Sequence, residues 1–122
     1  MTITKIEDEN MCFALVTGEE KVIADTQSAL DMLMTAKYEA GTKDIIIDKS
    51  LIADDFFILS TGMAGEILQK FINYGVRIAI YGDFTHYTSK PLHDFIYESN
   101  NGKDVFFVPT KEEAIAKLTG CR

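Results

Sequence analysis

The stretch from Asp44 to Gly82 constrains the fold of this chain more than any other part of it. It opens on a predicted strand over residues 44–48, whose centre is Ile45-Ile46-Ile47, and closes on a second apolar run over residues 76–81. Apolar runs without polar interruption are typical of strands that are covered on both faces. Between the two runs, apolar residues recur at helical spacing. These residues are Met63, Ala64, Ile67, Leu68, Phe71 and Ile72. The stretch predicts a strand, a helix and a second strand, which is the unit of a parallel sheet.

The alternation of strands and helices continues toward the carboxyl terminus. Ser89 and Pro91 are placed to begin a helix that Asn101-Gly102 ends, and a last helix follows Thr110. Serine and threonine cap helix N-termini, and proline fits the first turn. The apolar run over residues 105–108 predicts a strand between these helices. We expect the strand side chains to be mostly buried, namely Ile46, Ile47, Ile78, Ile80, Phe106 and Val108.

The amino-terminal part of the chain predicts paired strands. Residues 3–7 and Met11–Thr17 alternate or are apolar, and the polar residues 8–10 separate them as a turn. Such a pair joined by a short turn is antiparallel. Residues 21–24 form either a third, very short strand or a lead-in to the next element.

A helix is expected to follow, with Asp25 or Thr26 at its start and Gly41 at its end. Leu30, Leu33 and Met34 are spaced to face the core. The chain of 122 residues is therefore expected to be a single α/β domain over residues 1–122. Its sheet should be mixed but mainly parallel, with an N-terminal antiparallel strand pair and helices packed against it.

Composition narrows the partners that the chain can have. The formal net charge is -7, and an acidic domain repels nucleic acid and anionic lipid. No basic segment followed by an apolar core is visible at the amino terminus, so we expect a cytoplasmic protein. Cys12 and Cys121 show no paired spacing and are expected to be free thiols. No motif calls for a cofactor.

Two blocks of sequence resemble an uncharacterised bacterial family, the domain of unknown function 4180. The first block runs from Thr61 to Phe71 and continues to Gly82-Asp83-Phe84. The second covers residues 89–100. The likeness extends over most of the chain. It implies no activity, because none is established for the family.

The order of the elements also resembles the STAS fold of sulfate transporters and anti-sigma-factor antagonists. In that fold, an Asp-Ser-Ser/Thr-Gly-Leu turn at the start of the second helix is phosphorylated on its first hydroxyl residue. This chain has Leu59-Ser60-Thr61-Gly62-Met63 at the matching place, with Leu59 where the motif has aspartate. The resemblance implies that Ser60 is the phosphate acceptor of a regulatory domain.

Ser60, Thr61 and Gly62 form the first candidate site. A helix N-terminus carries unsatisfied N–H groups and a partial positive charge, which stabilise a phosphate or another anion. Serine and threonine also cap helices with no ligand present. The sequence leaves both interpretations open, and it places Ser60 at the N-cap of the helix.

The second candidate site is the loop edge of the sheet. Asp48 and Asp83 fall at the carboxyl ends of two strands, where open α/β sheets bind ligands. Converging carboxylates there could hold Mg²⁺, but aspartate is also common where a strand turns into a loop, and we predict no metal. His86, Ser89 and Lys90 follow in the next loop, where Lys90 and the Ser89 cap could bind an anion. No set of residues suggests catalysis.

Three functions compete on these observations. A non-catalytic STAS-like regulatory or protein-interaction domain is the first, and it would present Ser60 on a flat or convex surface. A small enzyme or ligand-binding domain is the second, and it would have a concave pocket with buried carboxylates near Asp48, Ser60 and Asp83. The third is a homodimer whose apolar interface contains Phe56-Phe57, two aromatic residues in the connection before the helix. The sequence equally allows these two rings to be buried against that helix.

Overall fold

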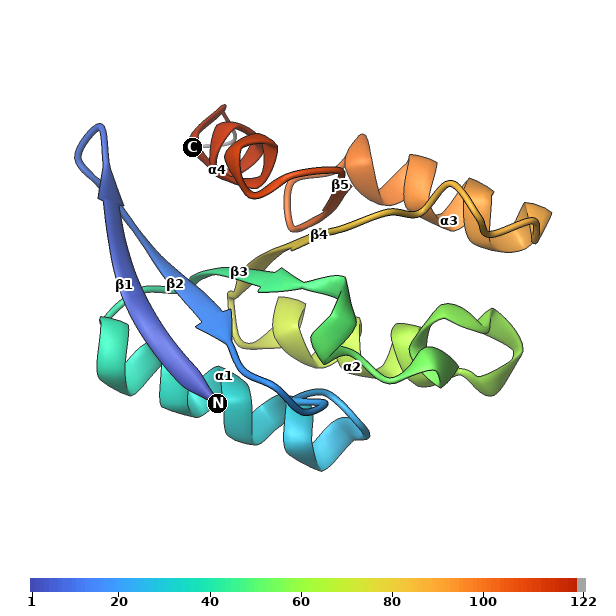
Figure 1. The fold of residues 1–122 in the computed structure, drawn as a ribbon, viewed down its shortest axis with the longest axis horizontal. Helices are drawn as coiled ribbons and strands as arrows, with labels where there is room; N and C mark the ends of the chain where they lie inside the picture. The colour runs from blue at the N-terminus through green and yellow to red at the C-terminus, as the bar shows by residue number, and fades with distance from the viewer. Residues whose placement is uncertain (121–122) are drawn as a thin grey trace.

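The computed structural model describes residues 1–120. Within them, five strands form one sheet, and four α-helices and three 3-10 turns surround it (Figure 1). The strands are β1 (Thr2–Asp8), β2 (Met11–Thr17), β3 (Asp44–Asp48), β4 (Arg77–Tyr81) and β5 (Val105–Val108). The helices are α1 (Thr26–Ala40), α2 (Met63–Asn73), α3 (Lys90–Asn100) and α4 (Lys111–Gly120). The 3-10 turns η1 (Lys49–Leu51), η2 (Asp54–Phe57) and η3 (Leu59–Thr61) connect β3 to α2.

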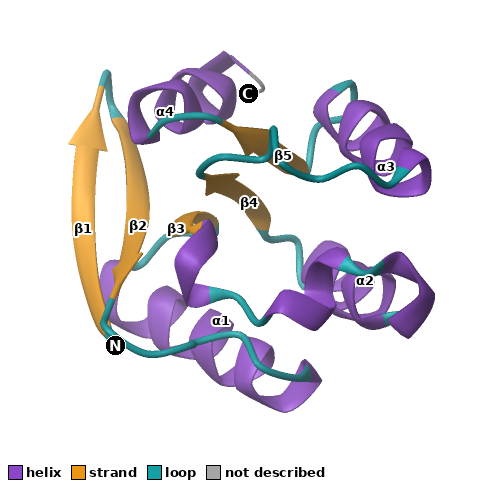
Figure 2. Ribbon diagram, turned by 45° about the vertical axis from the view of Figure 1, so that its right-hand side comes forward, coloured by secondary structure: helices purple, strands orange, loops and turns teal. Residues whose placement is uncertain are grey.

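The sheet has the predicted mixed topology. Its strands lie in chain order, β1-β2-β3-β4-β5 (Figure 2). β1 pairs with β2 in antiparallel register from Thr2↔Thr17 to Asp8↔Met11. The remaining neighbours are parallel, and each helical crossover advances the chain by one strand. The α/β fold predicted from the sequence, with an N-terminal antiparallel pair, is confirmed.

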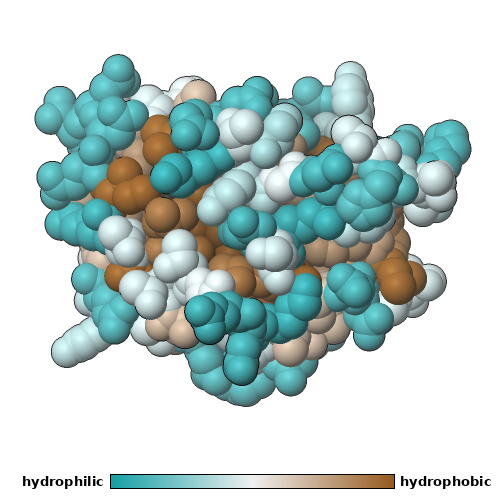
Figure 3. Space-filling model, viewed as in Figure 1, coloured by the Kyte–Doolittle hydropathy of each residue, from teal (hydrophilic) through white to brown (hydrophobic). Residues whose placement is uncertain are grey.

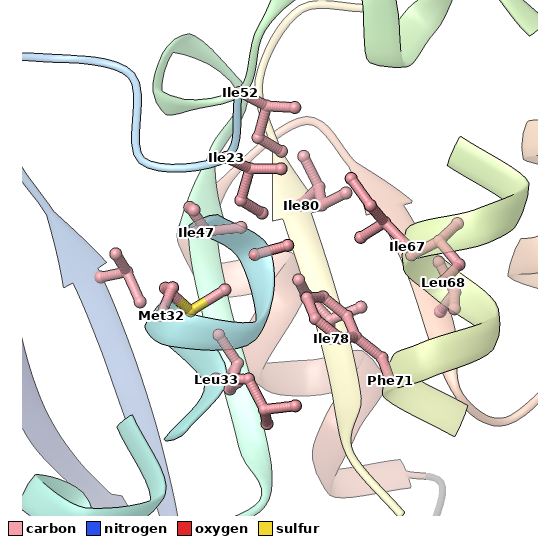
Figure 4. Packing of buried hydrophobic residues seen from close by; sticks show 14 of the residues in the cluster. Ile23, Met32, Leu33, Ile47, Ile52, Ile67, Leu68, Phe71, Ile78 and Ile80 are labelled. Atoms are coloured by element: carbon pink, nitrogen blue, oxygen red, sulfur yellow. The ribbon is translucent and has the colours of Figure 1, made fainter. Parts of the chain in front are cut away.

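Helices cover both faces of the sheet and create two apolar clusters. Side chains of α1, α2 and α3 pack on one face, together with Ile45 and Ile47 of β3. Figure 4 shows the centre of this cluster, where Leu33, Ile47, Phe71 and Ile78 meet. Ile46 points the other way, toward Ala114 and Leu118 of α4. All six predicted strand core residues are at most 5% exposed.

Helix α1 has the predicted ends but a different buried face. The Asp25 carboxylate accepts the Ser28 N–H at 2.7 Å, and the Ser28 hydroxyl accepts the Asp25 N–H at 3.0 Å, which completes a capping box. Gly41 closes the helix in the left-handed conformation, with φ of 64°. The predicted stripe was wrong at Met34, which is 44% exposed. The helix packs through Ala29, Met32, Leu33, Ala36 and Ala40, so alanines make up most of its buried face.

The connection between β3 and α2 carries part of the core. Phe56 and Phe57 are only 1% and 4% exposed. The rings are thus buried in the core, and the alternative that placed a dimer interface at them is wrong. Residues 21–24 form no third strand and make only an isolated bridge between Ile23 and Ile52. This bridge ties the lead-in of α1 to the connection, since the Ala53 N–H donates to the Ile23 carbonyl at 2.8 Å.

Two polar contacts secure the strands away from the core. Arg77 and Asp44, which are register partners at the start of β4 and β3, form two hydrogen bonds of 2.8 Å. At the outer edge of the sheet, the Asn100 side chain contacts the backbone of Phe107 twice. Its amide donates to the Phe107 carbonyl at 3.0 Å, and its oxygen accepts the Phe107 N–H at 2.7 Å. Asn100 thus fills the place that a neighbouring strand would take beside β5.

None of the helices in residues 1–120 is long and apolar enough to cross a bilayer. Cys12 is a free thiol, and its sulfur lies 3.9 Å from a carboxylate oxygen of Glu7. The prediction of a free thiol at Cys121 concerns a residue outside the described part of the chain.

Candidate functional site

The loops that follow β3 and β4 meet at one edge of the sheet, because these strands are parallel neighbours. Asp48 closes β3 opposite Tyr81, the last residue of β4. Lys49 therefore lies against Gly82, where an added Cβ would come 2.8 Å from the Lys49 Cβ. Gly82 has a φ of 152°, which side chains rarely adopt. This close approach joins the two loops at the sheet edge where the sequence predicted a site with Asp48 and Asp83.

Asp48 caps a turn in its own loop, and its charge affects a residue on the face of the sheet that α4 covers. Its carboxylate accepts the Ser50 N–H at 2.8 Å and caps the turn η1. Burial raises the pKa of the Tyr81 phenol, and the negative charges of Asp48 and Glu112 raise it further. Tyr81 packs against the cluster beneath α4. Asp48 and Tyr81 therefore belong to the face opposite helices α1, α2 and α3.

Asp83 is exposed and organises the loop after β4. Its carboxylate accepts the hydroxyl of Thr85 at 2.6 Å and the Thr85 N–H at 2.8 Å. These bonds lower the pKa of Asp83, and the nearby His86 and Lys49 lower it less. The carboxylate remains an anion, and it already accepts two hydrogen bonds from Thr85. It closes a local turn of the kind that aspartate often makes.

Lys49 extends from this edge over two aromatic rings. Its ammonium lies 5.0 Å from the ring centre of Tyr87 and 5.8 Å from that of Phe57. The two rings are stacked at 5.5 Å. Cations are attracted to the faces of aromatic rings at these distances. Lys49 thus joins the strand edge to the aromatic loop, a role that no local sequence pattern signals.

Beside these rings lies a concavity that we call the Ser60 hollow. It has a volume of about 390 Å³. It is lined by Phe57, Ile58, Leu59, Ser60, His86, Tyr87, Thr88, Ser89, Pro91 and Leu92. The apolar residues Phe57 and Leu92 are buried, whereas the hydroxyl residues Ser60 and Ser89 are exposed. The hollow therefore brings together Ser60 of the first predicted site with His86 and Ser89 of the second.

The prediction that Ser60 caps helix α2 was wrong. The helix begins at Met63, and its N-cap is Gly62 in the left-handed conformation, with φ of 77°. Ser60 lies in the preceding turn η3 and is exposed. The cap-like role falls to Thr61, whose hydroxyl donates toward the carbonyls of Asp55 and Ile58 at 2.9 Å and accepts the Met63 N–H at 3.2 Å. The left-handed glycine turns the chain here, so the N-cap lies two residues later than predicted. Ser60 therefore does not cap the helix.

Ser89 and Lys90 serve helix α3. Ser89 is its N-cap and accepts the Leu92 N–H at 3.4 Å. Lys90 pairs with Asp94 at 2.7 Å, and this contact raises the pKa of Lys90. A ring nitrogen of His93 also contacts the Tyr87 carbonyl, which fastens the loop to the helix. The groups expected to bind an anion are therefore engaged within α3.

The carboxylates do not converge as a cation site would require. Asp83 is exposed, Asp48 is half-buried, and each accepts hydrogen bonds within its own loop. In the described residues, no group of three or more histidine, cysteine, aspartate or glutamate side chains is arranged to hold a metal. No polar or charged residue in residues 1–120 is buried.

Comparison with known proteins places the chain in one family. It belongs to the family described as a domain of unknown function (DUF4180), whose sequence profile matches residues 8–118. No curated protein and no solved structure matches the chain.

Proposed function

We propose that this family member is a non-catalytic regulatory or protein-interaction domain that receives a partner protein at the Ser60 hollow. The flat or convex surface expected around Ser60 for such a domain was wrong, since Ser60 lines a concavity. The carboxylates that a small enzyme would bury there are not buried anywhere in residues 1–120. The observation that carries the proposal is therefore the composition of the hollow, which has a buried apolar floor and an exposed rim of hydroxyl groups. Such a surface combines burial of an apolar anchor with hydrogen bonding around it. The nearby ionic groups Asp83 and Lys90 already have partners within the chain.

The rim of the hollow also offers an exposed apolar side chain. Ile58 is 51% exposed and lies next to the buried Phe57. An exposed isoleucine beside a concavity extends the apolar contact area that a partner can cover. The carboxylates of Asp54 and Asp55 are exposed on the adjoining turn η2, and the chain as a whole carries a net charge of -7. We therefore propose a partner segment with an apolar anchor flanked by basic residues.

Ser60 is the proposed point of regulation. Its exposed hydroxyl sits on the rim, so that an added phosphate would bring about two negative charges to the contact surface. The phosphate would change docking rather than fold, because Ser60 makes no contact that secures helix α2. A partner with basic residues would bind the phosphorylated form more tightly, and one that requires a neutral rim would be released.

A second candidate is a small-molecule binding domain. A volume of about 390 Å³ lies within the usual range for ligand pockets, roughly 300–1,000 Å³. The carboxylates of Asp54, Asp55 and Asp83 are exposed and that of Asp48 is half-buried, which supports binding better than acid–base chemistry. A ligand that fills the hollow would raise the melting temperature of the isolated protein without any partner.

The proposal is tested by photo-crosslinking in the native host. A benzophenone amino acid at position 58 should capture a specific protein, whereas the same group at Ile72 on α2 should not. Ile72 is a matched control because it is also an exposed isoleucine, at 43%. The captured protein is then purified and its affinity measured by calorimetry. Ile58→Glu should weaken binding at least about tenfold, the loss expected for an interface anchor.

The controls separate docking from folding. Ile72→Glu should leave the affinity unchanged, and both variants should melt at the temperature of the wild type. Ser60→Ala should bind normally, and Ser60→Asp should alter the affinity. Equal capture at positions 58 and 72, or equal effects of the two glutamate variants, would contradict the proposed docking site.

A further inference from the structure

The outer edge of β1 is the feature that carries an inference beyond the proposed function. β1 is the first strand of the sheet and has a neighbour, β2, on one side only (Figures 1 and 2). It spans seven residues, Thr2–Asp8, without proline. Every second residue of such a strand directs its N–H and C=O groups away from the sheet. The opposite edge differs, since the Asn100 side chain is hydrogen-bonded to the backbone of Phe107 in β5.

The two faces of β1 carry different side chains. Ile3 packs with the α1 side of the core, and Lys5 and Glu7 share that face by alternation. Lys5 and Glu7 are well exposed and lie 3.5 Å apart. Ile6 belongs to the α4 side and is only partly buried. β1 therefore offers a charged row on one face and an isoleucine on the other.

The isoleucine is part of a larger apolar surface. Ile6, Met11, Leu15 and Ile115 are all partly exposed at the margin of the cluster beneath α4. In the space-filling view, apolar atoms surface between the β1–β2 hairpin and α4 (Figure 3). This strip runs up to the open edge of β1. A molecule that pairs with the edge would thus cover apolar side chains as well as backbone groups.

We propose that β1 pairs with β1 of a second copy of this chain, in antiparallel register about a two-fold axis at Ile6. Two-fold symmetry places the central residue opposite itself, so Ile6 faces Ile6 of the second copy. The apolar strips of both copies then become continuous. On the other face, Lys5 of each copy lies opposite Glu7 of the other, which gives two complementary charge pairs. Thr4 lies opposite Asp8.

Other registers do not combine an apolar pair on one face of β1 with pairs of opposite charge on the other face. An axis at Lys5 places the two lysines opposite each other and Ile3 opposite Glu7. An axis at Glu7 places two glutamates together. An axis at Thr4 places Lys5 opposite Ile3, so it forms no charge pair. Directly opposed like charges destabilise strand pairing, so the register centred on Ile6 is the one that the sequence of β1 favours.

The charge pairs allow a register-specific test by sedimentation equilibrium, from micromolar to millimolar protein. Wild type should dimerise within this range. Lys5→Glu and Glu7→Lys should each weaken the dimer about tenfold, because each turns two attractive pairs into repulsive ones. The double variant Lys5→Glu/Glu7→Lys should restore it. Lys103→Glu makes the same charge change at an exposed position between α3 and β5 and should have no effect.

A crosslinking experiment checks the register independently. In a Cys12→Ser/Cys121→Ser background, Ile6→Cys should form an intermolecular disulfide on oxidation, since opposed side chains have Cβ atoms about 4.5–5.5 Å apart. Ile3→Cys should not, because Ile3 does not face itself in this register. A wild-type chain that stays monomeric at millimolar concentration overturns the proposal. So does a double variant that remains as weak as the single variants.

Discussion

The two hydrogen bonds between Asn100 and Phe107 make the sharpest prediction about stability. Asn100→Ala removes the amide that accepts the Phe107 N–H at 2.7 Å and donates to its carbonyl at 3.0 Å. Each bond contributes about 1 kcal/mol net. Phe107 itself is only 4% exposed, so its backbone groups are left poorly hydrated. Each group that is left unsatisfied when buried costs about 1–3 kcal/mol.

Asn100 is only half-buried, so its truncation opens space for water beside these groups, which places the expected cost near the lower end of these ranges. We expect Asn100→Ala to lower the free energy of unfolding by about 2–3 kcal/mol. Chemical denaturation should show a lower midpoint with an unchanged slope, because the surface exposed on unfolding stays nearly the same. Asn101→Ala is the matched control. Asn101 is the neighbouring asparagine and is exposed, so its replacement should change stability by less than about 0.5 kcal/mol.

Asn100→Asp adds a test of the donor. An aspartate keeps one acceptor for the Phe107 N–H but turns a repulsive oxygen toward the carbonyl. Its protonated form can donate to that carbonyl, so the folded state raises the pKa of the new carboxyl group. The variant should therefore regain stability as the pH falls through this raised pKa. If Asn100→Ala and Asn101→Ala unfold at the same midpoint, the edge-pairing argument is refuted.

Three further predictions concern other parts of the fold. Ile78→Ala should lower the free energy of unfolding by about 2–5 kcal/mol, since Ile78 is fully buried, and a wild-type denaturation midpoint would show that it is not core. Gly82→Ala should destabilise the chain by about 1–3 kcal/mol in the same assay, because Gly82 has a φ of 152° and an added Cβ would contact Lys49. Gly65→Ala is the control and should not be destabilising. The bonds from Ser28 lower the pKa of Asp25 below its ordinary 3.8, so this carboxylate stabilises the fold above that pH and the effect is lost as the pH falls through the lowered value. Melting temperatures of Asp25→Asn should accordingly fall less on acidification than those of wild type, and parallel curves would contradict this.

The fold was predictable because burial follows the order of apolar and polar residues. The runs at residues 45–47, 76–81 and 105–108 are covered on both faces, and this requirement leaves a clear signature. The boundaries of β2, β3 and β5 match the predicted ones, and β4 begins one residue later. Asp25, Gly41 and Ser89 end or begin helices as expected because capping is a local interaction.

The candidate site was harder to predict, because it depends on contacts between distant segments. Gly62 rather than Ser60 starts helix α2, since the fit of η2 and η3 on the core decides where the chain reverses. The sequence left open whether Phe56 and Phe57 are exposed or buried, since no periodicity shows that a connection is buried. Lys49 meets Tyr87 only when two loops come together. The resemblance to the family covered most of the chain, but it carried no chemistry for these residues.

Asn100 connects the stability of the chain with its proposed assembly. A sheet that pairs through β1 in a two-fold dimer has two outer edges, both of them β5. At each of these edges, Asn100 is hydrogen-bonded to the backbone of Phe107, so a further strand cannot pair with the dimer there. Asn100→Ala would open both outer edges at once. We therefore expect this variant to form larger assemblies on concentration, which Ile78→Ala should not do at comparable stability, because its loss lies in the core. Light scattering of the two variants at matched fractions of folded protein distinguishes edge pairing from general unfolding. Equal aggregation of both would show that Asn100 stabilises the fold without guarding its edge.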